Sequence, residues 1–439
     1  MKPNASATRI RRLLPHGWIE VQLRDVATCR GGYGFPPREQ GQGNRIGSVP
    51  FFKVSDMNLA PNSRTMLVAN NYVDEPALKR LKVRLFDRDT VIFPKIGAAI
   101  GTNKKRILTA PSLVDNNVMG IWSTDRDRLT PDYLYFWLLS VDLRAWSAPG
   151  ALPSITQHAV LESRALLPPI AEQKEVASVL RAVQDAREAT RQAVEATLAL
   201  KQSLVRHLFT YGTGSVLRAE EVRLAETAAG PIPELWSVLS VGEICEVKGG
   251  KRLPKGHAFS STRTEFPYIR VVDLKNGSVD TGDLRFLTPE DRDVLRRYTI
   301  SSEDVYISIA GSIGIVGRVP EELDGACLTE NAAKLVLKDK RTLLPSFLAA
   351  FLASPIGRRQ IASFTATTTQ PKLALGRIAQ IRVAVPPLEE QERIASVLDS
   401  LRLRLSALND RQAALGHLFD SLLNVLLVGH RRLLSAEAA

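Results

Sequence analysis

The chain carries one long internal duplication. The string Leu14-Pro15-His16-Gly17-Trp18 returns as Ile232-Pro233-Glu234-Leu235-Trp236, and the Pro-Pro pair that begins at Pro168 returns at Pro386. The two tryptophans (236 minus 18) and the two prolines (386 minus 168) are both separated by 218 positions. Because two distant markers share one offset, a whole unit of domain plus connecting element is repeated.

The length of the repeat limits the architecture. Solenoid repeats have periods of roughly 20–50 residues, so this period is far too long for a solenoid. A repeat of this length holds a compact domain with its own core and a connecting element. The 439 residues therefore contain two such repeats with little left over, which predicts two similar domains that act on different targets.

The charge balance indicates the kind of partner. The chain has 58 Lys and Arg against 46 Asp and Glu, a net charge of +12. This excess favours an anionic partner, most simply nucleic acid; a basic protein without such a partner is the alternative. The charge lies in short clusters and not in a tail, which argues against binding through a disordered arm. The clusters are Arg9, Arg11 and Arg12; Lys104, Lys105 and Arg106; Lys248, Lys251, Arg252 and Lys255; Arg296 and Arg297; and Arg358 and Arg359.

Composition also bears on cofactors and location. Cys29, Cys245 and Cys327 form no CxxC pair, which is typical of a reduced, intracellular protein without a zinc site. No signal peptide is apparent, and no apolar run reaches the ~18 residues of a transmembrane helix. The histidines lack metal-ligand spacing, so we expect a cytoplasmic protein without metal or cofactor.

Each repeat begins with a mixed region of short apolar runs and turn residues, which predicts an α+β domain. We expect the boundaries to fall at residues 1–166, 167–225, 226–384 and 385–439, where the first and third segments are mixed domains and the others are helical. The runs that predict strands are Val49–Val54, Thr90–Phe93, Tyr268–Val272 and Asp304–Ile309, and those that predict short helices are Tyr133–Ser140 and Phe347–Leu352.

A long helical pattern follows each Pro-Pro pair. Residues Glu172–Thr210 and Glu390–Val428 contain no proline and, apart from Gly416, no glycine. The second stretch carries a heptad seam with Gln412 as its polar break, and the first seam is weaker. Each helix would be roughly 60 Å long and needs a partner for its apolar stripe. We expect an antiparallel coiled coil with pseudo-twofold symmetry between the repeats; the alternative is that each helix packs only on its own domain.

Several short strings recur in the same order in both repeats. The most specific is a strand end, Pro-Pro pair and Glu-Gln helix start at Leu166–Gln173 and Val385–Gln391. The segment Thr367–Leu373 contains Thr-Gln-Pro, and in its counterpart in the first repeat Leu152 replaces Gln370. Together with the Pro-x-x-Trp strings and the double glycines, these features resemble the specificity subunit of type I restriction-modification systems. The resemblance covers nearly the whole chain.

The resemblance implies two target-recognition domains and two helical regions. Each recognition domain is expected to read one half of a bipartite, asymmetric site in double-stranded DNA. The helices are expected to fix the number of unread base pairs between the halves. They would also dock methylation subunits, through which restriction subunits join the complex. The chain itself would neither methylate nor cleave DNA, and no membrane contact is implied.

The residues themselves give few signs of catalysis. The Pro-Pro pairs follow Leu167 and Val385, and not the Asn or Asp with which an amino-methyltransferase holds a flipped base. The segment Gly97–Lys104 lacks the Gly-Lys-Ser/Thr ending of a phosphate loop, and we interpret it as a strand–turn–strand element. Two alternatives stay open: a coiled-coil scaffold with a basic surface that gathers protein partners, and an enzyme with an unrecognised nuclease or transferase site.

Candidate DNA contacts come from the residue types that bind phosphates and base edges, which gather in the predicted loops. A solvated surface role is the alternative for each of them, and the Thr-Gln-Pro segment, the leading candidate, has the alternative role of shaping the junction with the helix. The loops after the double glycines differ in sequence, as expected for different half-sites. The candidates are Arg38, Arg45, Lys53, Lys95, Lys104, Lys105 and Ser154 in the first repeat, and Lys251, Arg252, Arg263, Arg270, Thr368, Thr369, Gln370 and Lys372 in the second.

Overall fold

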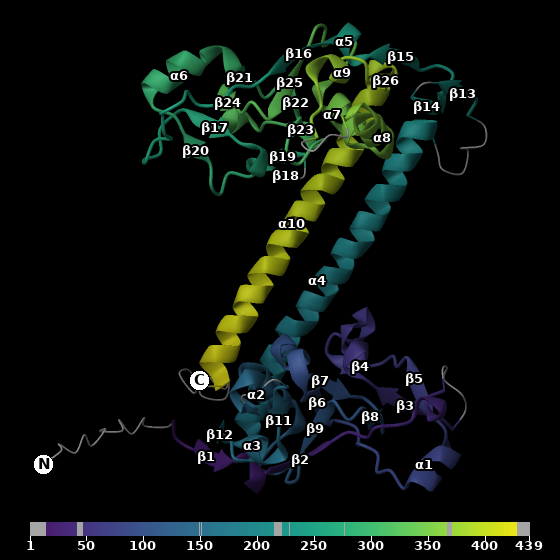
Figure 1. The fold of residues 1–439 in the computed structure, drawn as a ribbon, viewed down its shortest axis with the longest axis vertical. Helices are drawn as coiled ribbons and strands as arrows, with labels where there is room; N and C mark the ends of the chain where they lie inside the picture. Colours follow the sequence, from purple (N-terminus) through teal and green to yellow (C-terminus); the bar gives the residue numbers. More distant parts are fainter. Residues whose placement is uncertain are drawn as a thin grey trace, which may run out of the picture. The chain divides into compact units, whose positions relative to one another are not determined.

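The chain folds into two compact units. The computed structural model describes residues 15–41, 47–148, 150, 152–214, 222–227, 229–275, 277–366 and 371–427. The first unit comprises Met1–Thr190 with Arg411–Ala439, and the second comprises Arg191–Asp410. Each unit contains one of the repeated mixed domains and part of each long helix, α4 (Ile170–Tyr211) and α10 (Leu388–Leu427), as labelled in Figure 1.

The first unit is built on a sheet with the strand order β2-β9-β6-β7-β4. All four residues of β6 are buried, which explains its continuous apolar sequence. A smaller sheet has the order β5-β3-β8, and β1 and β10 form antiparallel pairs with β12 and β11. The strands are β1 (Ile19–Gln22), β2 (Ala27–Gly31), β3 (Val49–Phe52), β4 (Thr65–Met66), β5 (Asn71–Val73), β6 (Val91–Pro94), β7 (Arg106–Leu108), β8 (Leu113–Val114), β9 (Val118–Ser123), β10 (Ser147–Ala148), β11 (Ser154–Ile155) and β12 (Arg164–Leu167).

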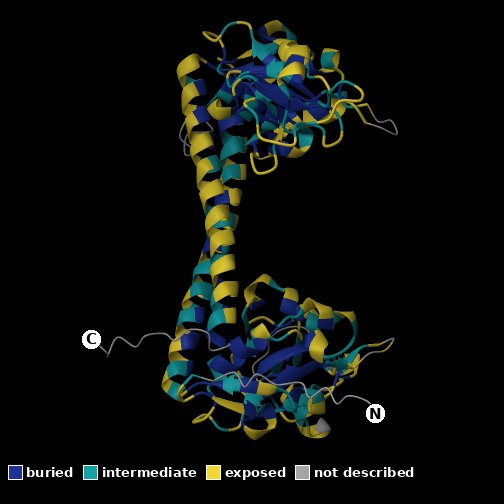
Figure 2. Cartoon of the chain, turned by 90° about the vertical axis from the view of Figure 1, so that its left-hand side faces the viewer, coloured by how far each residue is buried: buried dark blue, intermediate teal, exposed yellow. Residues whose placement is uncertain are grey.

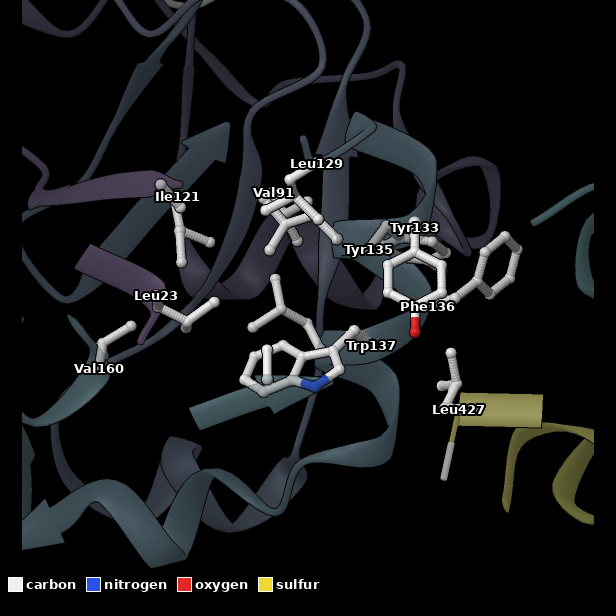
Figure 3. Close-up of a cluster of buried hydrophobic side chains, with 14 of the residues drawn as sticks. Leu23, Val91, Ile121, Leu129, Tyr133, Tyr135, Phe136, Trp137, Val160 and Leu427 are labelled. Atoms are coloured by element: carbon white, nitrogen blue, oxygen red, sulfur yellow. The ribbon is translucent and has the colours of Figure 1, made fainter. Parts of the chain in front are cut away.

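Helix α2 (Pro131–Ser140) closes the main core of the first unit by packing on β9. The helix is apolar almost all round, as expected for a buried helix, and Tyr133–Leu138 are all buried. Figure 3 shows Tyr133, Phe136 and Trp137 in one cluster with strand residues and with Leu427 of α10. The shorter helices of this unit are α1 (Glu75–Leu81) and α3 (Gln157–Leu161).

The second unit repeats this plan with two sheets of order β16-β25-β22-β23 and β20-β17-β24-β21. Strand β15 pairs with β26, β13 with β14, and β18 with β19. The strands are β13 (Leu224–Thr227), β14 (Gly230–Pro233), β15 (Ser237–Ser240), β16 (Cys245–Gly249), β17 (Pro267–Ile269), β18 (Leu274–Lys275), β19 (Ser278–Val279), β20 (Arg285–Phe286), β21 (Thr299–Ile300), β22 (Val305–Ser308), β23 (Val316–Arg318), β24 (Ala326–Leu328), β25 (Ala332–Leu337) and β26 (Arg382–Val385).

Helix α7 (Pro345–Ala353) takes the place of α2 in the second unit and packs on β22 and β23. Its Phe347 and Phe351 rings lie 5.7 and 5.4 Å from the ring of Phe209 on α4, between ring centres. Aromatic contacts therefore join the end of α4 to this core. The other helices are α5 (Val241–Ile244), α6 (Pro289–Leu295), α8 (Pro355–Phe364) and α9 (Leu375–Ile378).

The repeated motifs attach each domain to its long helix. In the first unit, the indole nitrogen of Trp18 donates to both carboxylate oxygens of Glu172 at 3.2 Å. The side chain of Gln173 is fully buried; its oxygen accepts from the backbone nitrogen of Thr130, and its nitrogen donates to the carbonyls of Arg128 and Pro168. One amide thus satisfies three backbone groups at the start of α4.

The second unit reproduces these contacts 218 positions later. Trp236 donates to Glu390 at 3.1 Å, and the buried Gln391 side chain bonds to the backbone of Leu344, Thr342 and Pro386. The strand that follows each tryptophan pairs with the strand before each Pro-Pro pair, β1 with β12 and β15 with β26. The motif strings therefore have a structural cause: they close each domain and fix the first turn of its helix.

Both long helices contribute to the core of each unit. In the first unit, Val176 and Leu180 of α4 belong to the same buried cluster as Phe419 of α10. In the second unit, Leu208 of α4 shares a cluster with Ile394 of α10. The remaining faces of the helices are exposed, as Figure 2 shows in yellow, so each helix is amphipathic as its periodicity predicts.

The predicted α+β architecture and its repetition are confirmed. The predicted runs at Val49, Thr90, Tyr268 and Asp304 correspond to β3, β6, β17 and β22 with ends shifted by a few residues. Between β6 and β7 the chain forms a 3₁₀ helix at Gly97–Thr102, so the turn of the expected strand–turn–strand element is helical. Among the described residues, no helix combines the length and apolar character needed to cross a membrane.

Candidate nucleic-acid interface

A tight backbone crossing follows β2 and β16 in the two units. The amide of Gly32 donates to the carbonyl of Val118, and that of Gly250 donates to the carbonyl of Ala332. A Cβ atom at Gly32 would lie 2.2 Å from the carbonyl oxygen of Asp115, and one at Gly250 would lie 2.2 Å from that of Thr329. Only glycine fits such a close backbone approach. The second glycine of each pair therefore fixes where the following loop leaves the sheet.

The first side chains beyond this crossing differ between the units. Tyr33 occupies the position in the first unit that Lys251 occupies in the second, and their backbone nitrogens donate to the equivalent carbonyls of Val114 and Leu328. Tyr33 is 43% exposed, and Lys251 is exposed. The same backbone position thus presents an aromatic hydroxyl in one unit and an ammonium group in the other.

In the first unit, Tyr33 belongs to a group of aromatic and basic side chains. Its ring lies 5.2 Å from that of Phe35, which lies 5.0 Å from that of Phe51. The ammonium of Lys53 lies 5.8 Å from the centre of the Phe51 ring and donates to Gln40 Oε1 at 2.6 Å. Arg38 is exposed on the 3₁₀ turn Pro37–Glu39, just before Gln40. Arg45, another candidate contact, lies outside the described residues.

A second group in the first unit joins Lys95 to Ser154. The backbone of Lys95 accepts from Ile155, and Ile96 forms a bridge with Ser154. The Lys95 ammonium lies over the backbone of Gly31, since a Cβ there would be 2.7 Å from it. The structure therefore brings Lys95 and Ser154 together beside the double glycine.

Lys104 and Lys105 have different environments although they are adjacent. Lys104 donates to Asn58, the last residue of the 3₁₀ helix that Lys53 precedes. The Lys105 side chain is buried, and its ammonium donates to Asn103 Oδ1 at 2.7 Å and to the carbonyl of Val141 at 2.6 Å. Burial lowers the pKa of Lys105 to about 8. Lys105 thus supports the loop from inside and does not present its charge at the surface.

In the second unit, three of the predicted arginines have partners near β17. Arg252 forms an ion pair with Glu330 at 2.9 Å, and the Arg263 guanidinium lies 5.7 Å from the centre of the Phe286 ring. Arg270 is held by Asp273 at 2.7 Å and by Asp283, and these contacts raise its pKa. Arg270 therefore stabilises the 3₁₀ turn that it precedes, whereas Arg263 is exposed.

The Thr-Gln-Pro segment lies mostly outside the described residues, which leave out Thr368, Thr369 and Gln370. The next residue of this group, Lys372, is exposed and forms a bridge with Ala310, as Ser154 does with Ile96 in the first unit. Ser154 and Lys372 therefore occupy equivalent places, each bridged to a residue that closely follows β6 or β22. The basic side chain of this place is Lys95 in the first unit and Lys372 in the second.

These clusters contain the donors that bind phosphates and base edges, and the aromatic Tyr33, but no arrangement typical of covalent chemistry. Burial raises the pKa of the Cys29 and Cys245 thiols to about 12, so both stay protonated near neutral pH. Among the described residues, no group of His, Cys, Asp and Glu has the placement of a metal site.

Sequence reasoning missed Tyr33 as a member of this surface. The signal was available, because Tyr33 aligns with Lys251 at the offset of 218, but a lone tyrosine does not stand out without the glycine crossing. Conversely, no pattern in the sequence distinguishes the half-buried Lys104 from the buried Lys105, since the two residues are chemically identical.

Comparison with known proteins gives a consistent result. The sequence matches the type I restriction modification DNA specificity domain over residues 15–196 and 233–415. It is 29% identical to the type I restriction enzyme EcoKI specificity subunit of Escherichia coli (strain K12) over 187 residues, 42% of this chain and 40% of that protein. It is 22% identical to the Escherichia coli EcoBI specificity subunit over 396 residues, 88% of this chain and 79% of that protein.

The fold has a counterpart among solved structures. The crystal structure of the S subunit of a type-I restriction-modification system from M. genitalium superposes with a TM-score of 0.63 at 14% identity, covering 95% of this chain and 98% of that chain. The two matched stretches of the family domain correspond to the two repeats identified by the offset of 218. The chain belongs to the family of type I restriction-modification DNA specificity domains.

Proposed function

We propose that this chain is the subunit that selects the DNA target of a type I restriction-modification complex. Each mixed domain, residues 1–166 and 226–384, reads one half of a bipartite, asymmetric site in double-stranded DNA. The segments 167–225 and 385–439 form the helical regions that connect them. The specificity subunits among the relatives and the family domain matched in both repeats support this proposal.

One observation is the main support for the proposal that the two domains read different half-sites. The double-glycine crossing has the same backbone contacts in both units, yet the first side chain beyond it is Tyr33 in one and Lys251 in the other. The partners of Lys53 and Arg270, which precede equivalent 3₁₀ turns, differ as well. A conserved scaffold with different donors is what two related domains need to recognise different base sequences.

Among the described candidates, we assign to the interface the side chains that are exposed or face polar partners at the loop surface, and we leave out the buried Lys105. Arg45, Thr368, Thr369 and Gln370 enter the proposal from the sequence alone. Lysines and arginines neutralise phosphates, whereas Gln, Ser, Thr and arginine side chains discriminate base edges. The proposed contacts are Arg38, Arg45, Lys53, Lys95, Lys104, Ser154, Lys251, Arg252, Arg263, Arg270, Thr368, Thr369, Gln370 and Lys372, with Tyr33 added.

The long helices act as the spacer in this proposal by pairing as an antiparallel coiled coil. The end of α10 shares a core with the start of α4, and the start of α10 shares a core with the end of α4. Between these ends, Thr190, Thr197 and Leu405 are buried although they lie on the long helices. Such burial supports pairing along the heptad seam.

The partners follow from the proposed role. The chain works in the cytoplasm with methylation subunits docked on its helical regions and with restriction subunits joined through them, and it carries no catalytic group of its own. The relatives are specificity subunits, which supports this division of labour.

Sequencing of modified bases in host DNA tests the proposal. We expect methylation at one bipartite motif to be present with the intact gene and lost on its deletion. Restoration by the gene on a plasmid is the control. If the chain were a scaffold without DNA specificity, deletion of the gene would leave the methylation pattern unchanged. That result, in a host where the methylation subunit is expressed, would contradict the proposal.

A further inference from the structure

The second unit contains a large cavity beside its long helices. Its volume is about 1900 Å³, and it is lined by α4, α7, α8 and α10 together with the loop that follows β22. Small-molecule pockets usually have volumes of roughly 300–1,000 Å³, so this cavity is of the size that receives part of a macromolecule. Its apolar lining includes Leu198 and Val205 of α4, Ala349 and Ala350 of α7, and Leu398 of α10.

The first unit shows why this space is open. Helices α2 and α7 both begin with proline, and the fifth and sixth residues are Tyr135 and Phe136 in α2 but Ala349 and Ala350 in α7. Tyr135 and Phe136 are each 1% exposed. Two large aromatic side chains of the first unit are thus replaced by two methyl groups in the second.

The long helices also provide an aromatic side chain at this place in the first unit and none in the second. Phe419 of α10 packs on Phe136 in the first unit, with 6.4 Å between ring centres, and it is covered by the guanidinium of Arg187 at 5.2 Å. The counterpart of Phe419 in α4, at the same number of residues from the start of its helix, is Lys201, and Lys201 lines the cavity. The space that the first unit fills with its own aromatic rings therefore lacks them in the second.

The cavity is also rich in positive charge. Lys201, Arg358 and Arg402 reach it from three different helices. Burial lowers the pKa of Lys201, and the nearby guanidinium groups of Arg358 and Arg402 lower it further. Carboxylates also line the cavity: Arg402 pairs with Asp399 at 2.7 Å, and Glu321 and Glu392 belong to the lining. The pKa of Lys201 is nevertheless lowered by the two guanidinium groups, so the three cations repel one another.

We propose that this cavity receives an acidic segment of a partner protein that carries a large apolar side chain. The apolar side chain takes the space filled by Tyr135, Phe136 and Phe419 in the first unit, and carboxylates pair with Lys201, Arg358 and Arg402. This inference rests on the proposed function, in which the partner is a methylation subunit. It adds that the second unit has an anchor that the first lacks.

Duplex DNA fits the cavity less well. Phosphates lie on the outside of the double helix and gain nothing from an apolar floor, and protein–DNA interfaces are more polar than protein–protein interfaces. A protein segment uses both features of the cavity, since interface anchors are large apolar side chains in pockets surrounded by polar groups.

The test is assembly of the full chain with the purified methylation subunit, measured as a dissociation constant by analytical ultracentrifugation. We expect Arg358→Glu to weaken assembly by at least about tenfold, since it opposes the partner carboxylates. Arg359→Glu is the matched control, because Arg359 is the next residue, is exposed and does not line the cavity. It should change the constant by less than about twofold.

A second variant tests the apolar part. Ala350→Phe fills the cavity with the side chain that the first unit has at this position, and it should weaken assembly while circular dichroism shows an unchanged helix content. Equal dissociation constants for Arg358→Glu, Arg359→Glu and the unaltered chain would overturn this inference alone. Loss of duplex DNA affinity in Arg358→Glu with unchanged assembly would also overturn it, in favour of DNA as the occupant. Failure of the unaltered chain to assemble would overturn the inference and the proposed function together.

Discussion

Gln173 and Gln391 show how one buried side chain fixes the junction between domain and helix. Each is fully buried and bonds to three backbone groups. Leucine at either position would leave these groups without partners, at a cost of about 1–3 kcal/mol each. We expect Gln173→Leu and Gln391→Leu each to lower the free energy of unfolding by at least about 2 kcal/mol in urea denaturation. Gln380→Leu is the control, since Gln380 is exposed in the turn between α9 and β26, and it should change this free energy by less than about 0.5 kcal/mol.

Lys105 predicts a pH dependence of stability. Burial lowers its pKa from the usual 10.5 to about 8, so between these values the unfolded chain holds a proton that the folded chain has released. The free energy of unfolding therefore rises with pH through this window because of this group. Relative to Lys105→Met, the unaltered chain should gain about 2 kcal/mol between pH 7 and pH 9.5, measured by urea denaturation. A difference that is constant with pH would contradict the lowered pKa.

Lys251 tests the candidate interface one charge at a time. Lys251 is exposed just beyond the glycine crossing, and its backbone nitrogen makes the hydrogen bond that is equivalent to that of Tyr33 in the first unit. We expect Lys251→Ala to weaken duplex binding and to reduce the slope of log affinity against log salt by about one. Arg341→Ala is the control, since Arg341 is 90% exposed and pairs with Asp339 outside the candidate clusters. An unchanged slope in Lys251→Ala would remove this lysine from the interface.

At the scale of elements, the long helices were predictable in type and length, because proline-free amphipathic stretches leave few alternatives. The strands β3, β6, β17 and β22 were predictable from a different signal, since each is a short apolar run between turn residues. The cavity was not, because it depends on Ala349 and Ala350 facing residues distant in sequence, and two alanines in a helix carry no local signal of a missing side chain.

The helices also give a prediction for the spacing between the half-sites. One heptad inserted after Gln192 in α4 and another after Asp410 in α10 preserves the seam, since the repeat is seven residues. Seven residues add about 10 Å to a helix, which equals about three base pairs of duplex. We expect the methylated motif to keep both half-sites and to gain about three base pairs between them. Insertion of three residues at the same places breaks the seam and should abolish methylation; an unchanged spacer in the heptad variant would show that the helices do not set it.

At the scale of the whole molecule, the repeat and its offset of 218 were the observations that predicted two similar mixed domains, each followed by a long helix. The resemblance rested on strings whose physical cause became visible only in the structure: the contacts of Trp18 with Glu172 and of Gln173 with the backbone. The interface was less predictable, because chemically equal lysines such as Lys104 and Lys105 differ only in where the fold directs them. Burial separates such residues, and sequence composition does not.

The central claim is that two repeats read two halves of one DNA site. Its most direct test is an exchange of residues 15–166 for the same domain of a relative with a different known target, followed by sequencing of modified bases in a host that supplies the methylation subunits. The account predicts that one half of the methylated motif changes to that of the relative, while the other half and the spacer stay as they were. Change in both halves, or in neither, would contradict it.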